Sequence, residues 1–545
     1  MSKWQKNSST ENVDKSLSCL EVIWNFQFSG EGHVADILLG AEGLPGELFS
    51  MAPNSEMHKV LDGALDLARR TPAILAQIDQ DQDVVALHKK AMRRADAQWR
   101  ASHTACLPGL VLPEATDSEL QVLPLEQGRP RMPAEVAYVF FVLQGYVGSL
   151  TDRGARDLLR ESQTVHAYLQ SRGQSFPGWS TILENVNAIS VATRSSIMDA
   201  QLAALRQDGL DDFSEAVVDS TAVRANSAWP TDGRTLLGLL GRAFRASQKL
   251  SDFGLPNLPK HWVPRWLDRL QGLLFRINIC GGKRHATRNR KKYYRQLLQT
   301  ALKVLAHLLP HSIQRDPLDE VSLPPSQQAL LSRLWEGLRD DLISACAVYD
   351  YTHERIFEDK TRPANDKLLS LGDPSASFIE KGGREPVIGY KPQLARSANG
   401  FVTGLIVNEG NDADSTQLAP IVDQIMERTG VCPAQVTADD GYAVQEVRDQ
   451  LLADGVEKVI LCGSKARAFT AEDEWDSVVH QAARRARSAV ESLVFVLKSM
   501  FGFGRLRRRG LEAVRAELLA KVVAHNFYRA VLLRGQAQAE ARKAA

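Results

Sequence analysis

One short β-branched segment, far from any other, constrains the fold of this chain most strongly. Residues 215–221 (EAVVDST) predict a buried strand. The next strand signals come only at 386–393 (PVIGYKPQ) and 400–408 (GFVTGLIVN), and the Gly and Asn residues between these two favour a hairpin. Residues 231–349 have the apolar spacing of helices. The sequence therefore predicts a sheet that is interrupted after its first strand by a helical block.

Helices and strands alternate after the hairpin. We expect helices at about 416–429, 443–453, 476–500 and 511–535, and strands at 434–438 and 457–462. This order predicts an α/β fold, with a mixed sheet and flanking helices. A large insertion inside such a sheet is tolerable, because the cost of closing a loop grows slowly with its length.

The first part of the chain has a different character. Residues 56–70 and 80–100 look helical, and the pattern from 133 to 210 is helical throughout. Five prolines in 107–133 predict a linker or an irregular segment. We therefore expect a mostly helical N-terminal region before the sheet.

Composition excludes several classes of protein. A chain of 545 residues is long enough for two to four domains, and 66 Lys and Arg residues nearly balance 65 Asp and Glu residues. No apolar run is long enough to cross a membrane, and the polar start Met1–Asn7 does not resemble a secretory signal. The six scattered cysteines form no Cys-x-x-Cys pair, which argues against a structural zinc site or a disulfide framework and favours a reducing cytosol.

The balanced net charge conceals two basic segments. Residues 281–295 contain seven Lys or Arg residues and no acid, and residues 484–510 contain eight with Glu491 as the one acid. Concentrated positive charge in a neutral protein suggests an anionic polymer as partner. The alternative is that both segments are solvated helix faces.

Three carboxylates stand at the ends of predicted elements. Asp219 ends the first strand, Asp439 follows the strand at 434–438, and Glu491 lies in the helix at 476–500. Strand ends of one sheet can bring the two aspartates together, and a helix across that edge can add the glutamate. Converging carboxylates repel one another unless a cation neutralises them. Mg²⁺ favours oxygen ligands, and two such ions can support phosphodiester chemistry.

The helix that carries Glu491 also has a distinct basic stripe. Arg487 lies four residues before Glu491 and Lys498 seven after it, so all three share one face. Taken singly, each feature has a simpler interpretation. The helix could hold an ordinary i,i+4 ion pair, Asp219 could cap a strand, and Asp439–Gly441 could be a turn.

Together these motifs resemble the DDE transposases of bacterial insertion sequences, which have an RNase H-like catalytic fold, and in particular the "not classified yet" group of insertion sequences. VVDSTAVRANSAWPTDGRTLLG is similar to the first-aspartate block of that group, and TADDGY to its Asp-x-Gly-Tyr motif. RSAVESLVFVLK fits Arg-x3-Glu-x6-Lys. The strands in 378–422 and the basic turn and closing helix in 502–529 also resemble the family, so the resemblance covers most of 133–535.

The resemblance implies roles for five residues. Asp219, Asp439 and Glu491 would be the metal-binding catalytic triad, with Arg487 and Lys498 as supporting cations. Two positions depart from the family pattern. Arg484 stands where the family often has Tyr, and Asp440 stands where a basic residue often follows the second aspartate. Either Asp439 or Asp440 could be the ligand, and the spacing to Gly441 favours Asp439.

The implied function is that of a DNA transposase. It would bind the terminal inverted repeats of an insertion sequence, cleave the ends and transfer the 3′-hydroxyl strand to target DNA, with two Mg²⁺ ions per site that Mn²⁺ can replace. We expect a homodimer in the DNA complex, no membrane association, and a bacterial cytoplasmic protein that joins the nucleoid when bound to DNA. The alternatives are an RNase H-like nuclease without strand transfer and a domesticated, catalytically silent DNA-binding protein.

The resemblance also divides the chain. We expect an N-terminal region at 1–132 for DNA-end binding or dimerisation, a helical domain at 133–212, a catalytic domain at 213–230 and 350–510, a helical insertion at 231–349, and a C-terminal helix and tail at 511–545. The helices at 133–210 are compatible with helix-turn-helix packing.

Basic residues are the expected DNA contacts, because phosphates supply most of the affinity. The predicted contacts are Lys283, Arg284, Arg288, Arg290, Lys291, Lys292, Arg505, Arg507, Arg508 and Arg509. Tyr293 and Tyr294 are available to stack. Trp229 is expected to be a core residue rather than a base-stacking one, and His353 a structural or surface residue rather than a ligand.

Overall fold

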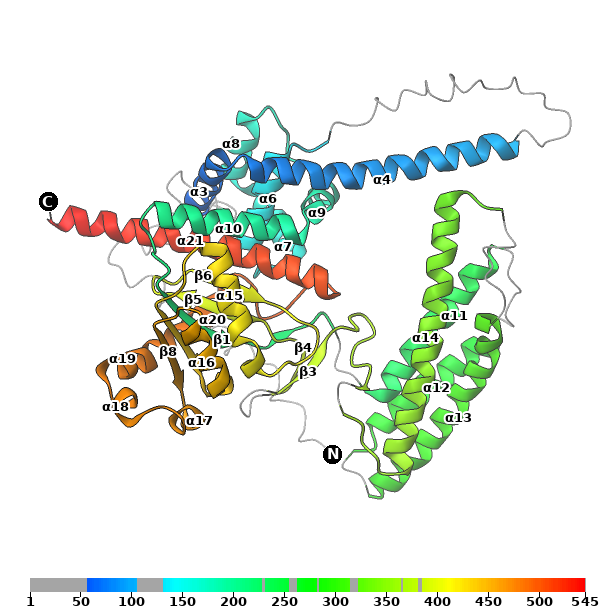
Figure 1. Ribbon diagram of the computed structural model, residues 1–545. Helices are drawn as coiled ribbons and strands as arrows, with labels where there is room; N and C mark the ends of the chain where they lie inside the picture. The colour runs from blue at the N-terminus through cyan, green and yellow to red at the C-terminus, as the bar shows by residue number, and fades with distance from the viewer. Residues whose placement is uncertain are drawn as a thin grey trace, which may run out of the picture.

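A computed structural model gives the architecture of the chain (Figure 1). It describes residues 56–104, 131–227, 231–253, 262–281, 284–313, 322–363, 366–380 and 385–544. The proline-rich segment expected at 107–133 lies almost entirely outside the described residues, as do Trp229 and Lys283. None of the described helices is long and apolar enough to cross a bilayer.

Five strands form the main sheet, in the order β6-β5-β1-β7-β8. They are β1 (Glu215–Ser220), β5 (Gln393–Ser397), β6 (Val402–Ile406), β7 (Gln435–Asp439) and β8 (Lys458–Cys462). β1 is antiparallel to β5 and parallel to β7, and β7 is parallel to β8. This is a mixed sheet with its first strand at the centre, so the predicted α/β, RNase H-like fold class is confirmed.

A hairpin does follow the helical block, but the prediction that residues 386–393 form its first strand was wrong. β5 and β6 pair as a hairpin around Gly400, whose φ of +90° suits a residue without a side chain. The strand expected at 386–393 is in fact two strands, β4 (Val387–Tyr390) and β5, which belong to different sheets. Pro392 separates them, and a proline cannot donate to a ladder.

A small second sheet adjoins the main one. Its strands are β2 (Val223–Arg224), β4 and β3 (Ser377–Ile379), in the order β2-β4-β3. β2 follows β1 directly, and Arg224 also bridges to Arg505. This sheet therefore links the end of the first strand to the basic segment near the end of the chain.

Helices cover the main sheet. α15 (Leu418–Thr429) and α16 (Gln445–Ala453) connect strands, and their apolar residues form a core with those of β1, β7 and β8. The single helix predicted at 476–500 is divided into α19 (Val478–Ala486) and α20 (Ser488–Met500), with Arg487 at the junction. Two short helices precede α19, namely α17 (Ser464–Arg467) and α18 (Glu472–Trp475).

The closing helix α21 (Leu511–Ala544) packs against part of a set of N-terminal helices. They are α3 (Glu56–Arg70), α4 (Ala73–Thr104), α6 (Ala134–Tyr146), α7 (Asp152–Glu161), α8 (Gln163–Ser171), α9 (Trp179–Ala188) and α10 (Val191–Gln207). α6 is apolar on all sides and almost wholly buried, as a helix inside a core must be. Gly145 allows α6 to approach Ala520 of α21 closely, because a Cβ there would lie 2.2 Å from the Ala520 oxygen. The predicted helical character of this region is confirmed.

The long block between the strands is a separate set of helices (Figure 1). It contains α11 (Asp232–Ser251), α12 (Trp262–Asn278), α13 (Ala286–Ile313) and α14 (Pro325–Phe357). Their apolar faces form a hydrophobic cluster distinct from those under the sheet. Within the described residues, this block also meets α4, where Asp96 accepts hydrogen bonds from the backbone and hydroxyl of Ser326.

Candidate active site at the strand ends

Asp219 and Asp439 lie at the ends of adjacent parallel strands. Val218 of β1 is the register partner of Ala438 of β7, and each aspartate is the next residue of its chain. Asp219 is buried, and its Oδ1 accepts a hydrogen bond of 2.7 Å from the Ser220 nitrogen. Asp439 is half-buried. The sheet therefore brings these two predicted site residues together.

Asp440 has a different role from its neighbour. Its Oδ1 accepts hydrogen bonds from the backbone nitrogens of Lys465 (2.8 Å) and Ala466 (3.4 Å), at the start of α17. The Ser464 hydroxyl also donates to its Oδ2. A carboxylate on the first amides of a helix satisfies donors that have no partner inside the helix. Asp439, by contrast, accepts a hydrogen bond of 2.9 Å from the Gly441 nitrogen, in the turn that follows β7.

A third acid that the sequence analysis missed lies beside the aspartate pair. Asp414 forms an ion pair with Lys391 (3.0 Å) and accepts a hydrogen bond of 2.9 Å from Gln393. Gln393 in turn accepts a hydrogen bond from the Tyr442 hydroxyl. Asp414 follows β6 in an irregular segment, GNDADST, which carries no strand or helix signal. Only the two-residue spacing of Asp412 and Asp414 could have drawn attention to it.

Electrostatic effects agree with this clustering. Burial raises the pKa of the Tyr442 hydroxyl, and the charges of Asp414, Asp219 and Asp439 raise it further. Burial alone would raise the pKa of Asp414, but hydrogen bonds from Gln393 and Lys391 lower it overall. The strand ends therefore carry a concentration of negative charge, with Lys391 as one cation that offsets it.

Helix α20 crosses this edge of the sheet. At one end, the Lys498 amine donates a hydrogen bond of 3.0 Å to the Ala222 carbonyl oxygen, three residues beyond Asp219. At the other end, Arg487 lies close enough to Cys462 to lower the pKa of its thiol, which burial raises. Cys462 is the register partner of Asp439. The Lys498 bond thus ties one end of α20 beside Asp219, and the other end lies near β8.

The Glu491 carboxylate is directed to Arg487 and not to the two aspartates in this structure. It forms an ion pair of 3.2 Å with Arg487, and its side chain is 60% exposed. In the part of the chain that the structure describes, no three His, Cys, Asp or Glu side chains are arranged to hold a metal ion. The two aspartates supply the hard oxygen donors that a divalent cation prefers, so they fit such an ion. Glu491 would have to leave Arg487 to join them.

Arg484, which stands where the resembled family often has Tyr, is held by an aromatic ring. Its guanidinium lies 4.6 Å from the ring centroid of Trp475, and that of Arg467 lies 5.1 Å from the same ring. Cation–π contacts of this kind fix the direction of a long side chain. Arg484 also acts on Cys462, so it lies near the aspartate edge.

The basic segment at 284–295 forms the start of α13 in the helical block. Its predicted contacts Arg284, Arg288, Arg290 and Lys292 are exposed, and Lys291 is half-buried. The expectation that Tyr294 could stack on DNA was wrong. Tyr294 is buried in the core of the helical block, because it lies on the apolar face of α13. Tyr293 is half-buried with Arg276 over its ring.

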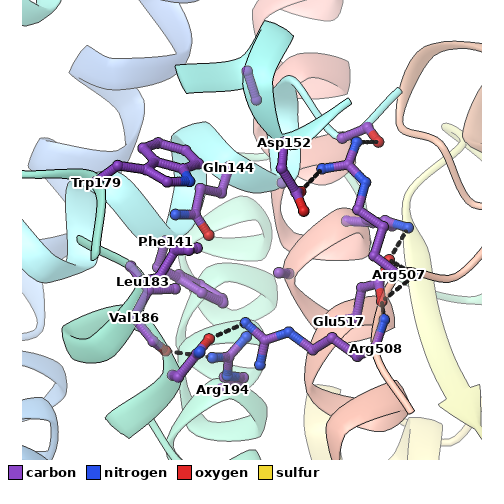
Figure 2. Close-up of a pocket in the computed structure, with 16 residues that line it drawn as sticks. Phe141, Gln144, Asp152, Trp179, Leu183, Val186, Arg194, Arg507, Arg508 and Glu517 are labelled. Atoms are coloured by element: carbon purple, nitrogen blue, oxygen red, sulfur yellow. Dashed lines mark hydrogen bonds and ion pairs between the residues drawn. The ribbon is translucent and has the colours of Figure 1, made fainter. Parts of the chain in front are cut away.

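The second basic segment divides into exposed and engaged arginines. Arg505 and Arg509 are exposed. Arg507 donates hydrogen bonds to Asp152 and to the Gly148 oxygen, both 2.8 Å away, and Arg508 donates to Asn187. Figure 2 shows both side chains lining a pocket against the N-terminal helices. These two guanidinium groups therefore bind protein partners in this structure.

The same pocket contains a buried cation. Arg194 donates hydrogen bonds to the carbonyl oxygens of Val186, Ile189 and Ala516, and so ties α10 to α21. Burial and, to a lesser extent, the charge of Arg508 lower its pKa to about 9. Carbonyl oxygens accept the Arg194 donors, and Glu517 accepts from the Arg508 backbone nitrogen and pairs with Lys521, so the pocket acts as a joint between the N-terminal helices and the basic segment.

Comparison with protein families now adds to this geometry. Residues 361–527 match the family model of the transposase DDE domain. This part of the chain is therefore similar to a transposase DDE domain. The match includes Asp439 and Glu491, whereas Asp219 precedes it across the helical block. No curated protein and no solved structure gave a match.

The family match bears on the earlier expectations. It confirms the resemblance to a DDE transposase, and it makes DNA the partner class of this domain. Transposases with a DDE domain generally use divalent metal ions. His353 pairs with Glu358 and packs on Phe357 at the surface of α14, so the expectation of a structural or surface residue is confirmed.

Proposed function

We propose that this protein is the transposase of an insertion sequence. It binds the terminal inverted repeats of its element, cleaves the ends, and joins the freed 3′-hydroxyl to target DNA. The observation that carries this proposal is the meeting of Asp219 and Asp439 at adjacent strand ends, with Lys498 of α20 bound to the Ala222 oxygen beside them. The transposase DDE domain match supports the same reading.

Asp219, Asp439 and Glu491 are the proposed metal ligands. Divalent ions, two of Mg²⁺ or Mn²⁺ in this proposal, would supply charge stabilisation for the attacking and leaving oxygens when bound. The engagement of Asp440 with α17 supports Asp439 as the ligand. Glu491 lies on the helix that crosses the same edge, and a change of its side-chain torsions away from Arg487 would direct it to the pair.

The cations of α20 have separate proposed roles. Lys498 fixes the loop after β1 through the Ala222 oxygen, and so holds the backbone next to Asp219. Arg487 neutralises Glu491 in the absence of a ligand, and it can release the carboxylate and turn to a DNA phosphate. Such an exchange would replace one ion pair with another.

The remaining parts of the chain would position DNA. The catalytic domain would comprise 213–230 and 350–510, interrupted by a DNA-contacting helical insertion at 231–349. The regions 1–132 and 133–212 would bind the transposon ends or dimerise, and 511–545 would close the fold. Exposed Arg284, Arg288 and Arg505 support phosphate contacts near the site. Transposition requires the two ends of the element to be held together. We therefore propose that the protein is a homodimer on DNA and acts at the bacterial nucleoid.

A cleavage and strand-transfer assay tests this proposal. The full chain is incubated with duplexes that carry the element's ends, taken from DNA flanking the gene, and with Mg²⁺ or Mn²⁺. We expect nicks at the ends and joined products, and we expect Asp219→Asn, Asp439→Asn and Glu491→Gln to reduce both by more than about 100-fold, since even outer partners of a metal site are worth 10- to 100-fold.

Asp440→Asn is the matched control, because it changes the neighbouring carboxylate in the same way. It should keep most of the activity. Cleavage that survives Asp439→Asn but not Asp440→Asn would contradict the assignment of the ligand. Nicks without joined products would indicate a nuclease, and binding without cleavage in either metal would indicate a catalytically silent DNA-binding protein.

A further inference from the structure

The side-chain amide of Gln393 is buried between the ends of two strands. Gln393 begins β5, has an exposed fraction of 2%, and is the register partner of Ser220, the residue after Asp219. Its Nε2 donates a hydrogen bond of 2.9 Å to the Asp414 carboxylate, and its Oε1 accepts one from the Tyr442 hydroxyl. An ionised carboxylate only accepts hydrogen bonds, so these two partners fix the direction of the amide.

The Tyr442 end of this amide holds the turn that follows Asp439. Tyr442 is wholly buried and ends the 3₁₀ turn η5 (Asp440–Tyr442), which begins directly after Asp439. In the same turn, the Gly441 nitrogen donates to the Asp439 carboxylate. The bond from the Tyr442 hydroxyl to Gln393 therefore limits how far this turn can move from β5.

The Asp414 end is held by further contacts. The Lys391 amine pairs with Oδ1 of Asp414 at 3.0 Å and also donates to the Asp412 carbonyl oxygen at 2.8 Å. A Cβ atom at Gly441 would lie 3.0 Å from Oδ1 of Asp439 and 3.3 Å from Oδ2 of Asp414. The two carboxylates therefore border the same small space, next to a residue without a side chain.

This network begins where the paired part of the strands ends. The register between β1 and β7 stops at Val218 and Ala438, one residue before each aspartate. Asp219 and Asp439 thus lie beyond the last register pair of their strands. The pairing of β5 places Gln393 beside the end of β1, and its side chain binds the turn after β7. The amide therefore connects the two strand ends beyond the point where their pairing stops.

We propose that Gln393 is a positioning residue that sets the spacing of Asp219 and Asp439, and through it the affinity of the site for a divalent ion. Groups that bind a metal ion are themselves oriented by outer hydrogen bonds, and loss of such a partner typically weakens binding by 10- to 100-fold. This inference rests on the proposed function and goes beyond it, because it assigns a role to a neutral side chain that contacts neither DNA nor metal. A buried amide that only filled the core would change stability but not metal affinity.

Metal titrations with the full chain and duplexes of the element's end test this role. Gln393→Met keeps the length of the side chain but removes its hydrogen-bonding groups, and Tyr442→Phe removes only the hydroxyl. We expect both variants to need about 10- to 100-fold more Mn²⁺ for half-maximal cleavage, and to cleave at a rate near that of the wild type when Mn²⁺ is saturating. Mn²⁺ binding to each protein–DNA complex, measured by electron paramagnetic resonance, should weaken by the same factor and does not depend on activity.

An exchange of the two partners provides a rescue. Gln393→Glu alone should weaken Mn²⁺ binding, because an ionised carboxylate cannot donate to Asp414 and repels it. Gln393→Glu combined with Asp414→Asn puts the donor and the acceptor in each other's place and restores the net charge. This double variant should recover most of the wild-type affinity for Mn²⁺.

Gln201→Met is the matched control. Gln201 of α10 also has an exposed fraction of 2%, and its amide donates to the Val523 carbonyl oxygen of α21. The variant therefore loses a buried amide bond of the same kind and should keep the wild-type dependence on Mn²⁺. Thermal unfolding checks that each variant retains the fold.

Two results would overturn the inference. One is a wild-type dependence on Mn²⁺ in both Gln393→Met and Tyr442→Phe, and the other is an equal shift in Gln201→Met. If Asp439→Asn abolishes cleavage while Gln393→Met and Tyr442→Phe behave like the wild type, only the positioning role fails. If the wild-type chain neither binds Mn²⁺ nor cuts the ends, the proposed function fails as well.

Discussion

The amine of Lys498 and the carbonyl oxygen of Ala222 form a hydrogen bond of 3.0 Å, although 276 residues separate them in the chain. This bond fixes α20 to the loop after β1, next to Asp219. It therefore sets the distance between the helix that carries Glu491 and the first strand. A helix held at only one end could tilt away from the strand ends.

The first prediction concerns this bond. Lys498→Met keeps the length of the side chain but removes the donor, so α20 should lose its tie to Ala222. We expect end cleavage to fall by roughly 10- to 100-fold, as for other residues that orient a metal site. Lys498→Arg should retain part of the activity. Thermal unfolding of Lys498→Met should change little, since one half-buried hydrogen bond contributes about 1 kcal/mol. Full cleavage by Lys498→Met would contradict the positioning role.

The second prediction separates Asp439 from Asp440 by stability. Asp440→Ala removes the acceptor of three donors at the start of α17 and should lower the free energy of unfolding by about 1 kcal/mol. Asp439→Ala leaves the bonds of Asp440 to α17 in place and relieves repulsion with Asp219, so it should cost less. Urea unfolding at pH 7 measures both. A larger loss for Asp439→Ala would show that the capping interaction is not the stabilising one.

The third prediction distinguishes the exposed arginine from the engaged one. Arg505→Ala should weaken DNA binding, and the slope of log K against log salt should fall by about 0.9 if one phosphate contact is lost. Arg507→Ala should leave that slope unchanged and instead lower the melting temperature, because Arg507 binds Asp152 and the Gly148 oxygen. Titration of labelled duplex at several salt concentrations measures the slope. Equal slopes for the wild type and Arg505→Ala would exclude a phosphate contact there.

The fourth prediction concerns acid stability. Burial, together with the charges of Arg529 and Arg396, lowers the pKa of His525 on α21 from its ordinary value of 6.5 to about 4. The folded state therefore keeps this imidazole neutral while the unfolded chain protonates it below pH 6.5. The stability that it contributes is present above pH 6.5 and is lost as the pH falls toward 4, by up to about 3 kcal/mol.

His525→Gln removes this titration but keeps a polar side chain. Between pH 6.5 and 4, its free energy of unfolding should fall less steeply than that of the wild type. Carboxylates titrate in the same range in both proteins, so the difference between the two curves isolates His525. Parallel curves would contradict the buried, neutral state of this imidazole.

The sequence by itself determined the kinds of elements and their order. The β-branched run at β1, the strand β6, and the apolar spacing of α11, α13 and α14 are local patterns with local causes. Side-chain periodicity decides between helix and strand before any tertiary contact forms. The sequence also predicted that Asp219 and Asp439 lie close together, because residues at the ends of two parallel strands meet at one edge of the sheet.

Only the tertiary structure decided which partner each polar group takes. Asp439 and Asp440 are identical in type and adjacent in sequence, but the approach of α17 engages Asp440 alone. Arg507 and Arg508 look like free basic residues until α7 and α9 bring Asp152 and Asn187 to them. Tyr294 looks available until α11, α12 and α14 cover it. These outcomes depend on contacts between segments that are far apart in the chain. Hydrogen bonding and burial act only over a few ångströms, so the partner of each polar group is set by which segments the fold brings together.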